Sequence, residues 1–197
     1  MKIAVFGSDA SAECDGIRRN AREIGREIAR RGHTLVTGAC GGYPYDAVVG
    51  AYKAGGRCIG FSPTTDEKSH RELGMPVDGF SKIIYITDVF EFKPQYVEML
   101  KIDETVCRKY RNVSSAAFSD AAVIIGGRTG TMNEFTDVYD FGRNIGILED
   151  SGGITYRAIK TLLVDTGKAS RSKIVTDRDP IKLLDKLLDD GVEGIIF

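Results

Sequence analysis

The sequence predicts a single doubly wound α/β domain of three layers, with a mostly parallel sheet of about seven strands between two layers of helices. Apolar, β-branched runs recur along the 197 residues, with helical patterns between them. The runs are continuous rather than alternating in hydrophobicity, which is typical of strands buried on both faces of a parallel sheet. Alternation of strand and helix implies right-handed crossovers. No linker or repeat divides the chain, so residues 1–197 are expected to form one domain.

Four strands are expected in the first half of the chain, at 2–7, 34–38, 57–61 and 82–87. A helix is expected at 16–31, because apolar residues recur there at helical spacing and Gly32 can end it. A second helix is expected at 44–54, where small residues allow a close approach to the sheet. The polar segment 62–81 is expected to be a loop at the carboxyl ends of the strands, with His70 exposed to solvent.

The second half continues the alternation. Three further strands are expected at 121–126, 145–149 and 173–176, and helices at 93–118, 131–142, 153–166 and 179–190. The end of the long helix carries an apolar stripe directly before the next strand. Pro180 lies near the start of the last helix, where its fixed φ suits the first turn.

Composition excludes several classes of protein. Net charge is −1, so no global attraction to nucleic acid or to an anionic membrane is expected, and no apolar run approaches the length that spans a bilayer. Two histidines and four scattered cysteines (Cys14, Cys40, Cys58, Cys107) predict neither a zinc site nor another metal site. The chain begins with a strand-like run rather than a signal peptide, and free thiols suit a reducing compartment. We therefore expect a cytoplasmic protein without nucleic-acid or membrane partners.

The most informative stretch is 121–135, where an apolar run ends in a glycine-rich loop that leads into a helix. Backbone N–H groups of such a loop, together with a helix start, favour an anion, most often a phosphate. The loop residues expected to bind phosphate are Gly127, Arg128, Thr129, Gly130 and Thr131. Glu134 follows in what is expected to be the first helical turn, and it is there either for chemistry or to complement the helix dipole.

Two other strand ends carry candidate ligand contacts. Gly38, Gly41 and Gly42 follow the second strand and precede a helix, which makes a second anion cradle. Gly7 and Ser8 end the first strand, but the remaining glycines of a dinucleotide fingerprint are missing, so a standard NAD enzyme is not expected. Both places can also be explained as tight turns without a ligand.

A basic cluster precedes the glycine-rich loop. Arg108 and Lys109 are expected on a solvated helix face, whereas Arg111 is expected to offer its planar fork to a phosphate or carboxylate. Asn112 is adjacent and is expected to contribute to the same site. The chain thus combines two glycine loops with one arginine.

This combination resembles the LOG-type Rossmann family, long labelled lysine decarboxylases and part of the SLOG superfamily. The resemblance covers about residues 2 to 165. It rests on the G-G-x-x-G-T-x-x-E pattern that ends at Glu134, on the upstream Arg111, and on the earlier V-x-G-x-x-G-G loop. The family includes cytokinin-activating phosphoribohydrolases and molybdenum-cofactor carriers. The resemblance implies a phosphorylated small-molecule ligand, a homo-oligomer, and no cofactor beyond a bound nucleotide, phosphate or molybdopterin-type molecule.

In the hydrolases of this family the resemblance implies cleavage of the N-glycosidic bond of a nucleoside 5′-monophosphate. Glu134 would then be catalytic, and Arg111 would neutralise the phosphate and orient the ribose. The chain departs from the hydrolase pattern at Gly126, Arg128 and Asn133, and has Asn112 where the hydrolases usually have lysine. These departures favour the carrier and unassigned branches. The alternative is therefore a non-enzymatic carrier or sensor of a phosphorylated ligand such as molybdenum cofactor.

Overall fold

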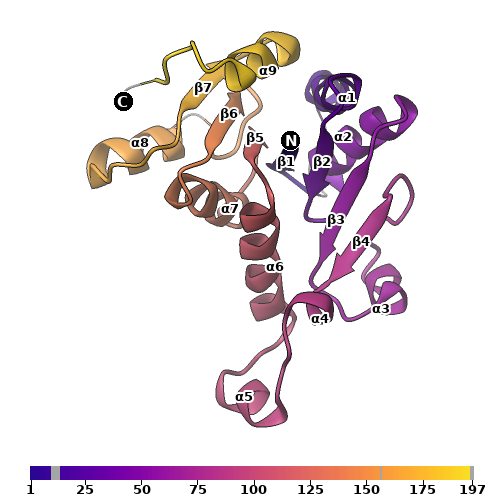
Figure 1. The fold of residues 1–197 in the computed structure, drawn as a ribbon. Coiled ribbons are helices and arrows are strands. Elements are labelled where there is room, and N and C mark those ends of the chain that lie inside the picture. The colour runs from indigo at the N-terminus through magenta and orange to yellow at the C-terminus, as the bar shows by residue number, and fades with distance from the viewer. Residues whose placement is uncertain (10–13, 156, 196–197) are drawn as a thin grey trace.

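The structure, a computed structural model, describes residues 1–9, 14–155 and 157–195 and confirms the predicted three-layer α/β fold. Seven parallel strands form one sheet in the order β4-β3-β2-β1-β5-β6-β7 (Figure 1). The strands are β1 (Lys2–Gly7), β2 (Thr34–Thr37), β3 (Cys58–Ser62), β4 (Lys82–Tyr85), β5 (Ala121–Ile125), β6 (Asn144–Leu148) and β7 (Ile174–Asp177). The central strands β1 and β5 are almost entirely buried, as their continuous apolar sequences predict.

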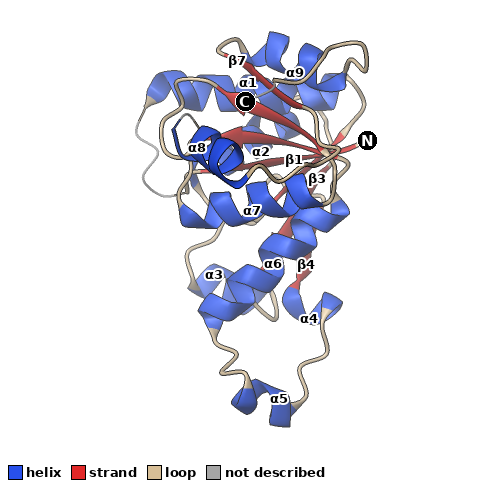
Figure 2. Cartoon of the chain, turned by 90° about the vertical axis from the view of Figure 1, so that its left-hand side faces the viewer, coloured by secondary structure: helices blue, strands red, loops and turns tan. Residues whose placement is uncertain are grey.

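Helices cover both faces of the sheet (Figure 2). One layer contains α1 (Asp15–Arg30), α2 (Gly42–Lys53) and α9 (Pro180–Leu188), and the other contains α6 (Glu104–Phe118), α7 (Thr129–Asp140) and α8 (Arg157–Thr166). Successive side chains of each strand point to opposite faces of the sheet and pack in two separate apolar cores. Val5 packs in the first core and Phe6 in the second. The sheet is therefore fixed on both sides, and its strand ends form a rigid edge.

The expected helix at 93–118 is wrong, because the structure divides it into α5 (Pro94–Met99) and α6. The break lies at Lys101, whose φ is 49°, and Asp103 starts α6 by accepting a hydrogen bond from the Val106 N–H (2.9 Å). No residue of α5 is buried, and the helix lies at the tip of an excursion away from the sheet (Figures 1 and 2). The helical pattern of the sequence continues through 93–118, so it did not indicate that a second helix begins after Asp103.

The segment 62–81 also differs from the expected loop. It contains α3 (Glu67–Glu72), which Asp66 and Ser69 start with reciprocal cap hydrogen bonds. His70 is fully buried rather than solvated, with Nδ1 2.9 Å from Ser62 Oγ and Nε2 3.0 Å from the Pro76 carbonyl oxygen. A polar residue was predicted to be exposed because its partners could not be seen from the sequence.

Other boundaries shift by a few residues. The strand expected at 82–87 ends at Tyr85 and is followed by the short helix α4 (Ile86–Val89), and the helix expected at 131–142 begins earlier, at Thr129. Helix α8 starts at Arg157, and residue 156 of the expected helix 153–166 lies outside the described residues. Within the described ranges, no helix is long and apolar enough to cross a bilayer.

Candidate functional site

The centre of the sheet contains a topological switch point. From β1 the chain continues through β2, β3 and β4 toward one edge of the sheet, and from β5 it continues toward the other. Ligands of open α/β sheets bind in the crevice that forms where the order reverses, outside the carboxyl ends of the strands. Gly7 and Ile125 are register partners there, and a Cβ at Gly7 would overlap the Ile125 carbonyl oxygen. Glycine is needed at this strand end for close strand packing.

Ser8 joins the loops of the crevice. Its Oγ accepts a hydrogen bond from the Gly127 N–H (2.8 Å), and its carbonyl oxygen accepts one from the Tyr43 N–H (2.9 Å). The Thr131 hydroxyl donates to the Gly7 carbonyl oxygen (3.2 Å). The Gly127 N–H and the Thr131 hydroxyl, both expected to hold phosphate directly, therefore stabilise the loop itself.

Among the described residues, none accepts a hydrogen bond from the first N–H groups of α7. The first helical hydrogen bond is donated by the Met132 N–H to the Arg128 carbonyl oxygen, so the N–H groups of Thr129, Gly130 and Thr131 precede it. The side chain of Arg128, the N-cap residue, makes no cap hydrogen bond. These N–H groups and the positive end of the helix dipole are a favourable environment for an anion.

The start of α7 opens onto a cavity of about 440 Å³. The residues that line it come from the ends of β1 and β2, from α6 and from the start of α7: Gly7, Ser8, Asp9, Cys40, Thr105, Arg108, Lys109, Arg111, Asn112, Arg128, Thr129, Gly130, Thr131 and Glu134. Four of them are basic and two acidic. Arg128 pairs with Asp9 (2.9 Å) across the mouth, and Arg108 pairs with Glu104 on its own helix. Lys109 and Arg111 contribute the remaining positive charge.

Arg111 is the most constrained charge of the cavity. Its side chain is 7% exposed, and Nη1 donates to the Gly38 carbonyl oxygen. Its Nε has no hydrogen-bond partner among the described residues, although it is buried. A Cβ at Gly38 would overlap the guanidinium, so this glycine makes room for the arginine. A buried guanidinium with an unused donor is typical of an anion site.

Glu134 lies beside this arginine, in the second turn of α7 rather than in the first turn as expected. The helix starts earlier than predicted, so complementing its dipole does not explain the acid. Glu134 is 7% exposed, and burial raises the pKa of its carboxyl to about 7 although Arg111 opposes the shift. A carboxyl with this pKa can both accept and donate a proton near neutral pH.

The second glycine loop acts mainly through packing. Gly41 is the N-cap of α2, and a Cβ at Gly42 would overlap the carbonyl oxygens of Ser8 and Asp9. Cys40, between Gly38 and these two glycines, is the residue of this loop that lines the cavity. Sequence reasoning did not single out Cys40 or Thr105. The position of Cys40 within the glycine loop was the signal that could have identified it.

Asn112 and Asn133, two positions that depart from the hydrolase pattern, contact each other. Nδ2 of Asn112 donates to Oδ1 of Asn133 (3.1 Å), with a longer contact to the Gly130 carbonyl oxygen (3.5 Å). The pair joins α6 to α7 beside the cavity. The two departures are therefore coupled, and together they form a neutral amide pair.

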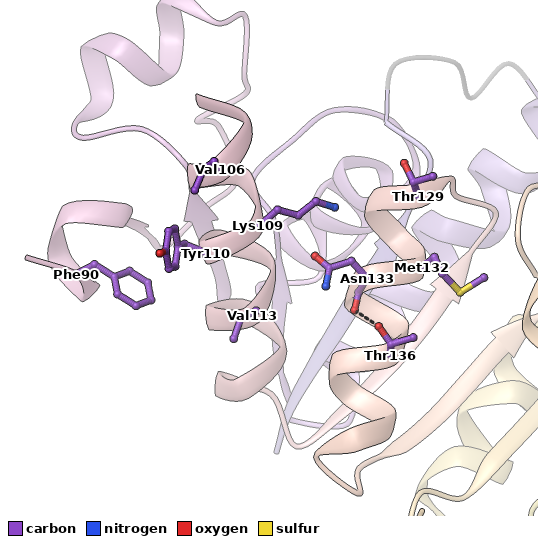
Figure 3. Close-up of a pocket in the computed structure, with 9 residues that line it drawn as sticks. All are labelled: Phe90, Val106, Lys109, Tyr110, Val113, Thr129, Met132, Asn133 and Thr136. Carbon is purple, nitrogen blue, oxygen red and sulfur yellow. Dashed lines mark hydrogen bonds between the residues drawn. The ribbon is translucent and has the colours of Figure 1, made fainter. Parts of the chain in front are cut away.

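An apolar groove of about 870 Å³ adjoins the cavity between α6 and α7 (Figure 3). Its lining residues are Phe90, Val106, Lys109, Tyr110, Val113, Thr129, Met132, Asn133 and Thr136. Lys109 and Thr129 line both spaces. A polar, basic cavity is thus continuous with an apolar surface that can contact a ring.

The parallel sheet and the glycine-rich crevice at its switch point define a Rossmann-like α/β protein. The chain belongs to the SLOG cluster4 family, whose model matches residues 1–184. The resemblance to LOG-like proteins is thereby confirmed. A curated protein from Archaeoglobus fulgidus is 26% identical over 150 residues, which are 76% of this chain and 82% of the relative.

Two solved structures illustrate the shared fold. TM1055 is 20% identical, with a TM-score of 0.70, and the alignment covers 94% of this chain and 98% of that one. The molybdenum cofactor carrier protein of Chlamydomonas reinhardtii is 22% identical, with a TM-score of 0.64, and the alignment covers 95% of this chain and 98% of the carrier. At these identities the similarity shows the fold.

The expectation that nucleic acid is excluded as a partner is wrong. DNA processing protein A from Helicobacter pylori, described for its single-stranded DNA binding mode, is 19% identical with a TM-score of 0.61, and the alignment covers 96% of this chain and 81% of that one. The fold is therefore compatible with a nucleic-acid ligand. Net charge failed as a criterion because binding depends on local charge, and the cavity concentrates basic residues in a chain of net charge −1.

Proposed function

We propose that this protein binds a phosphorylated small molecule, with the phosphate at the N-terminus of α7 and against Arg111. The observation that carries the proposal is the buried Nε of Arg111, which has no partner among the described residues although it lies in a basic cavity. A phosphate oxygen supplies the missing acceptor, and the N–H groups of Thr129 and Gly130 bind the other oxygens. Ser8, Gly38, Gly127 and Thr131 hold the loops in place.

The adjacent groove extends the proposal to the rest of the ligand. An inorganic phosphate leaves the groove empty, whereas a nucleotide or a phosphorylated pterin also brings a planar ring. Tyr110 and Val113 line the groove and provide aromatic and aliphatic surface for such a ring. The likeness to molybdenum cofactor carriers supports carriage without turnover as the leading form of this function. For a molybdopterin-type ligand, the same cavity residues would hold its phosphate.

Replacement of Arg111 tests the proposal. Arg111→Met removes the charge and the unpaired donor, and we expect the Kd for adenosine 5′-monophosphate to rise by about 10- to 100-fold. Arg26→Met makes the same change on an exposed arginine of α1 and should leave the Kd unchanged. Calorimetry measures the Kd, and a thermal melt of each variant reports whether it folds. Equal affinity in wild type and a folded Arg111→Met variant would contradict the phosphate site.

A second candidate function is hydrolysis of the N-glycosidic bond of a nucleoside monophosphate, and the pKa of Glu134 favours it. The oxygen of the attacking water would form the new bond to the ribose carbon while Glu134 takes one of its protons. The bond between the ribose carbon and the base breaks, and the base leaves with the electron pair and takes up a proton from solvent. Incubation with a panel of nucleoside monophosphates, scored for free base, tests this. If the Glu134→Gln variant still releases free base at the wild-type rate, Glu134 has no catalytic role. If wild type binds a nucleotide tightly but releases no base from any of them, the carrier function is favoured.

A further inference from the structure

Hydrogen bonds connect three side chains on α6 and α7 and fix the orientation of two side-chain amides. Nδ2 of Asn133 donates to Oδ2 of Asp137 (3.2 Å), and Oδ1 of Asn133 accepts from Nδ2 of Asn112 (3.1 Å). A carboxylate accepts and an amide has one donating and one accepting end, so Asp137 sets the orientation of Asn133 and Asn133 sets that of Asn112. Figure 3 shows Asn133 on the side of α7 that faces α6.

The reverse orientation of Asn112 is unfavourable. It would place Oδ1 of Asn112 against the Gly130 carbonyl oxygen and Oδ1 of Asn133, which are both acceptors. In the observed orientation, Oδ1 of Asn112 is buried and has no hydrogen-bond partner in the described part of the chain. Asn112 is 3% exposed and lines the anion cavity. A buried acceptor without a donor is costly, which indicates that a ligand supplies the donor.

The neighbouring residue provides the complementary group. Arg111 is 7% exposed and its Nε is a buried donor without a partner among the described residues, so two consecutive cavity-lining residues of α6 contain one unpaired donor and one unpaired acceptor. A phosphate can pair with Arg111, because all its oxygens accept. A fully ionised phosphate cannot pair with Oδ1 of Asn112 because it has no proton to donate. The two residues therefore require different groups of one ligand.

We propose that Asn112 selects phosphate esters that carry a hydrogen-bond donor close to the phosphate, of the kind that a sugar hydroxyl provides. Asn133 and Asp137 are positioning residues, which keep Oδ1 of Asn112 directed at that donor. The inference rests on the proposed phosphate site and adds the chemical class of the ligand, a hydroxylated phosphate ester. It also gives a role to the two asparagines that replace charged residues of the hydrolases.

Binding of matched nucleotides to the full chain tests this inference. Adenosine 5′-monophosphate and its 2′,3′-dideoxy analogue differ only in the ribose hydroxyls, and inorganic phosphate has no ester group. We expect wild type to bind the hydroxylated nucleotide at least about 10-fold more tightly than the dideoxy one. Asn112→Ala should bind the two equally. Asn133→Ala frees the Asn112 amide to rotate. This variant should therefore have a smaller ratio of the Kd for the dideoxy nucleotide to the Kd for adenosine 5′-monophosphate than wild type has.

Ser114→Ala is the control. Its hydroxyl donates to the Tyr110 carbonyl oxygen on the same helix, outside the cavity, so the ratio should stay at the wild-type value. Equal binding of both nucleotides by wild type, or a ratio that Asn112→Ala leaves unchanged, overturns the selection by Asn112. In those cases, phosphate binding by wild type keeps the proposed function intact. Failure of all three probes to bind wild type overturns both proposals.

Discussion

Glu134 places a carboxyl beside the proposed phosphate, where a negative charge repels the ligand. Its raised pKa resolves this conflict, because a carboxyl that is already close to protonation at pH 7 can become neutral when an anion arrives. Arg111 then retains its charge for the phosphate. The acid can thus be accommodated in an anion site without being catalytic, and its protonation state becomes linked to occupancy.

This linkage predicts proton uptake on binding. At pH 7.5 the free carboxyl is mainly ionised, since its pKa is about 7, and a bound phosphate raises that pKa further. Binding of adenosine 5′-monophosphate should therefore take up a fraction of a proton, and affinity should fall as pH rises above about 7. Calorimetry in two buffers with different heats of ionisation measures the uptake. Glu134→Gln should abolish it, and an uptake that is identical in this variant would refute the linkage.

At the scale of elements, the loop between β5 and α7 shows two different uses of glycine. Gly127 has a φ of 103°, and a Cβ there would overlap Thr131. Gly130, in the first turn of α7, has no atom near the position of an added Cβ. One glycine is required by the shape of the loop, and the other leaves space in front of the helix for the ligand.

Alanine substitutions distinguish these two uses. Gly127→Ala should lower the free energy of unfolding by about 2 to 4 kcal/mol, because the left-handed backbone and the overlap are both unfavourable. Gly130→Ala should leave it unchanged or raise it by up to about 1 kcal/mol, because alanine favours a helix. Urea unfolding of the two variants gives both values. A similar loss in each would show that the space at Gly130 is not free.

At the scale of the whole molecule, stability is unevenly distributed. The central strands β1 and β5 are buried on both faces, whereas α5 has no buried residue and carries exposed Tyr96, Met99 and Leu100. Local opening is easiest where few apolar contacts would be lost. Amides of 94–102 should therefore exchange hydrogen with solvent far faster than those of β5. Exchange followed by mass spectrometry measures this, and protection of α5 equal to that of α6 would show that it packs against another surface.

The parts that the sequence could predict are those that depend on local pattern. All seven strands were expected within a few residues, because strands buried on both faces have continuous apolar sequences. Arg111, Glu134 and the start of α7 were expected at one site and do line one cavity. The Gly127 N–H donates to Ser8, which is distant along the chain, so no local pattern predicts this hydrogen bond. His70 is buried because the segment 62–81 folds back and brings its ring to Ser62, and the polar sequence of that segment does not predict this contact.

The hydrogen bond from Gly127 to Ser8 joins residues 119 positions apart, and it lies where β1 meets β5. During synthesis, β1 to β4 emerge first, and in any partial sheet they form, β1 is an unprotected edge until β5 arrives. Addition of β5 covers this edge, and the same event brings Ser8, Arg111 and Glu134 together. The cavity is therefore complete only when β5 lies beside β1. A ligand that recognises it acts only on chains whose two half-sheets have already joined.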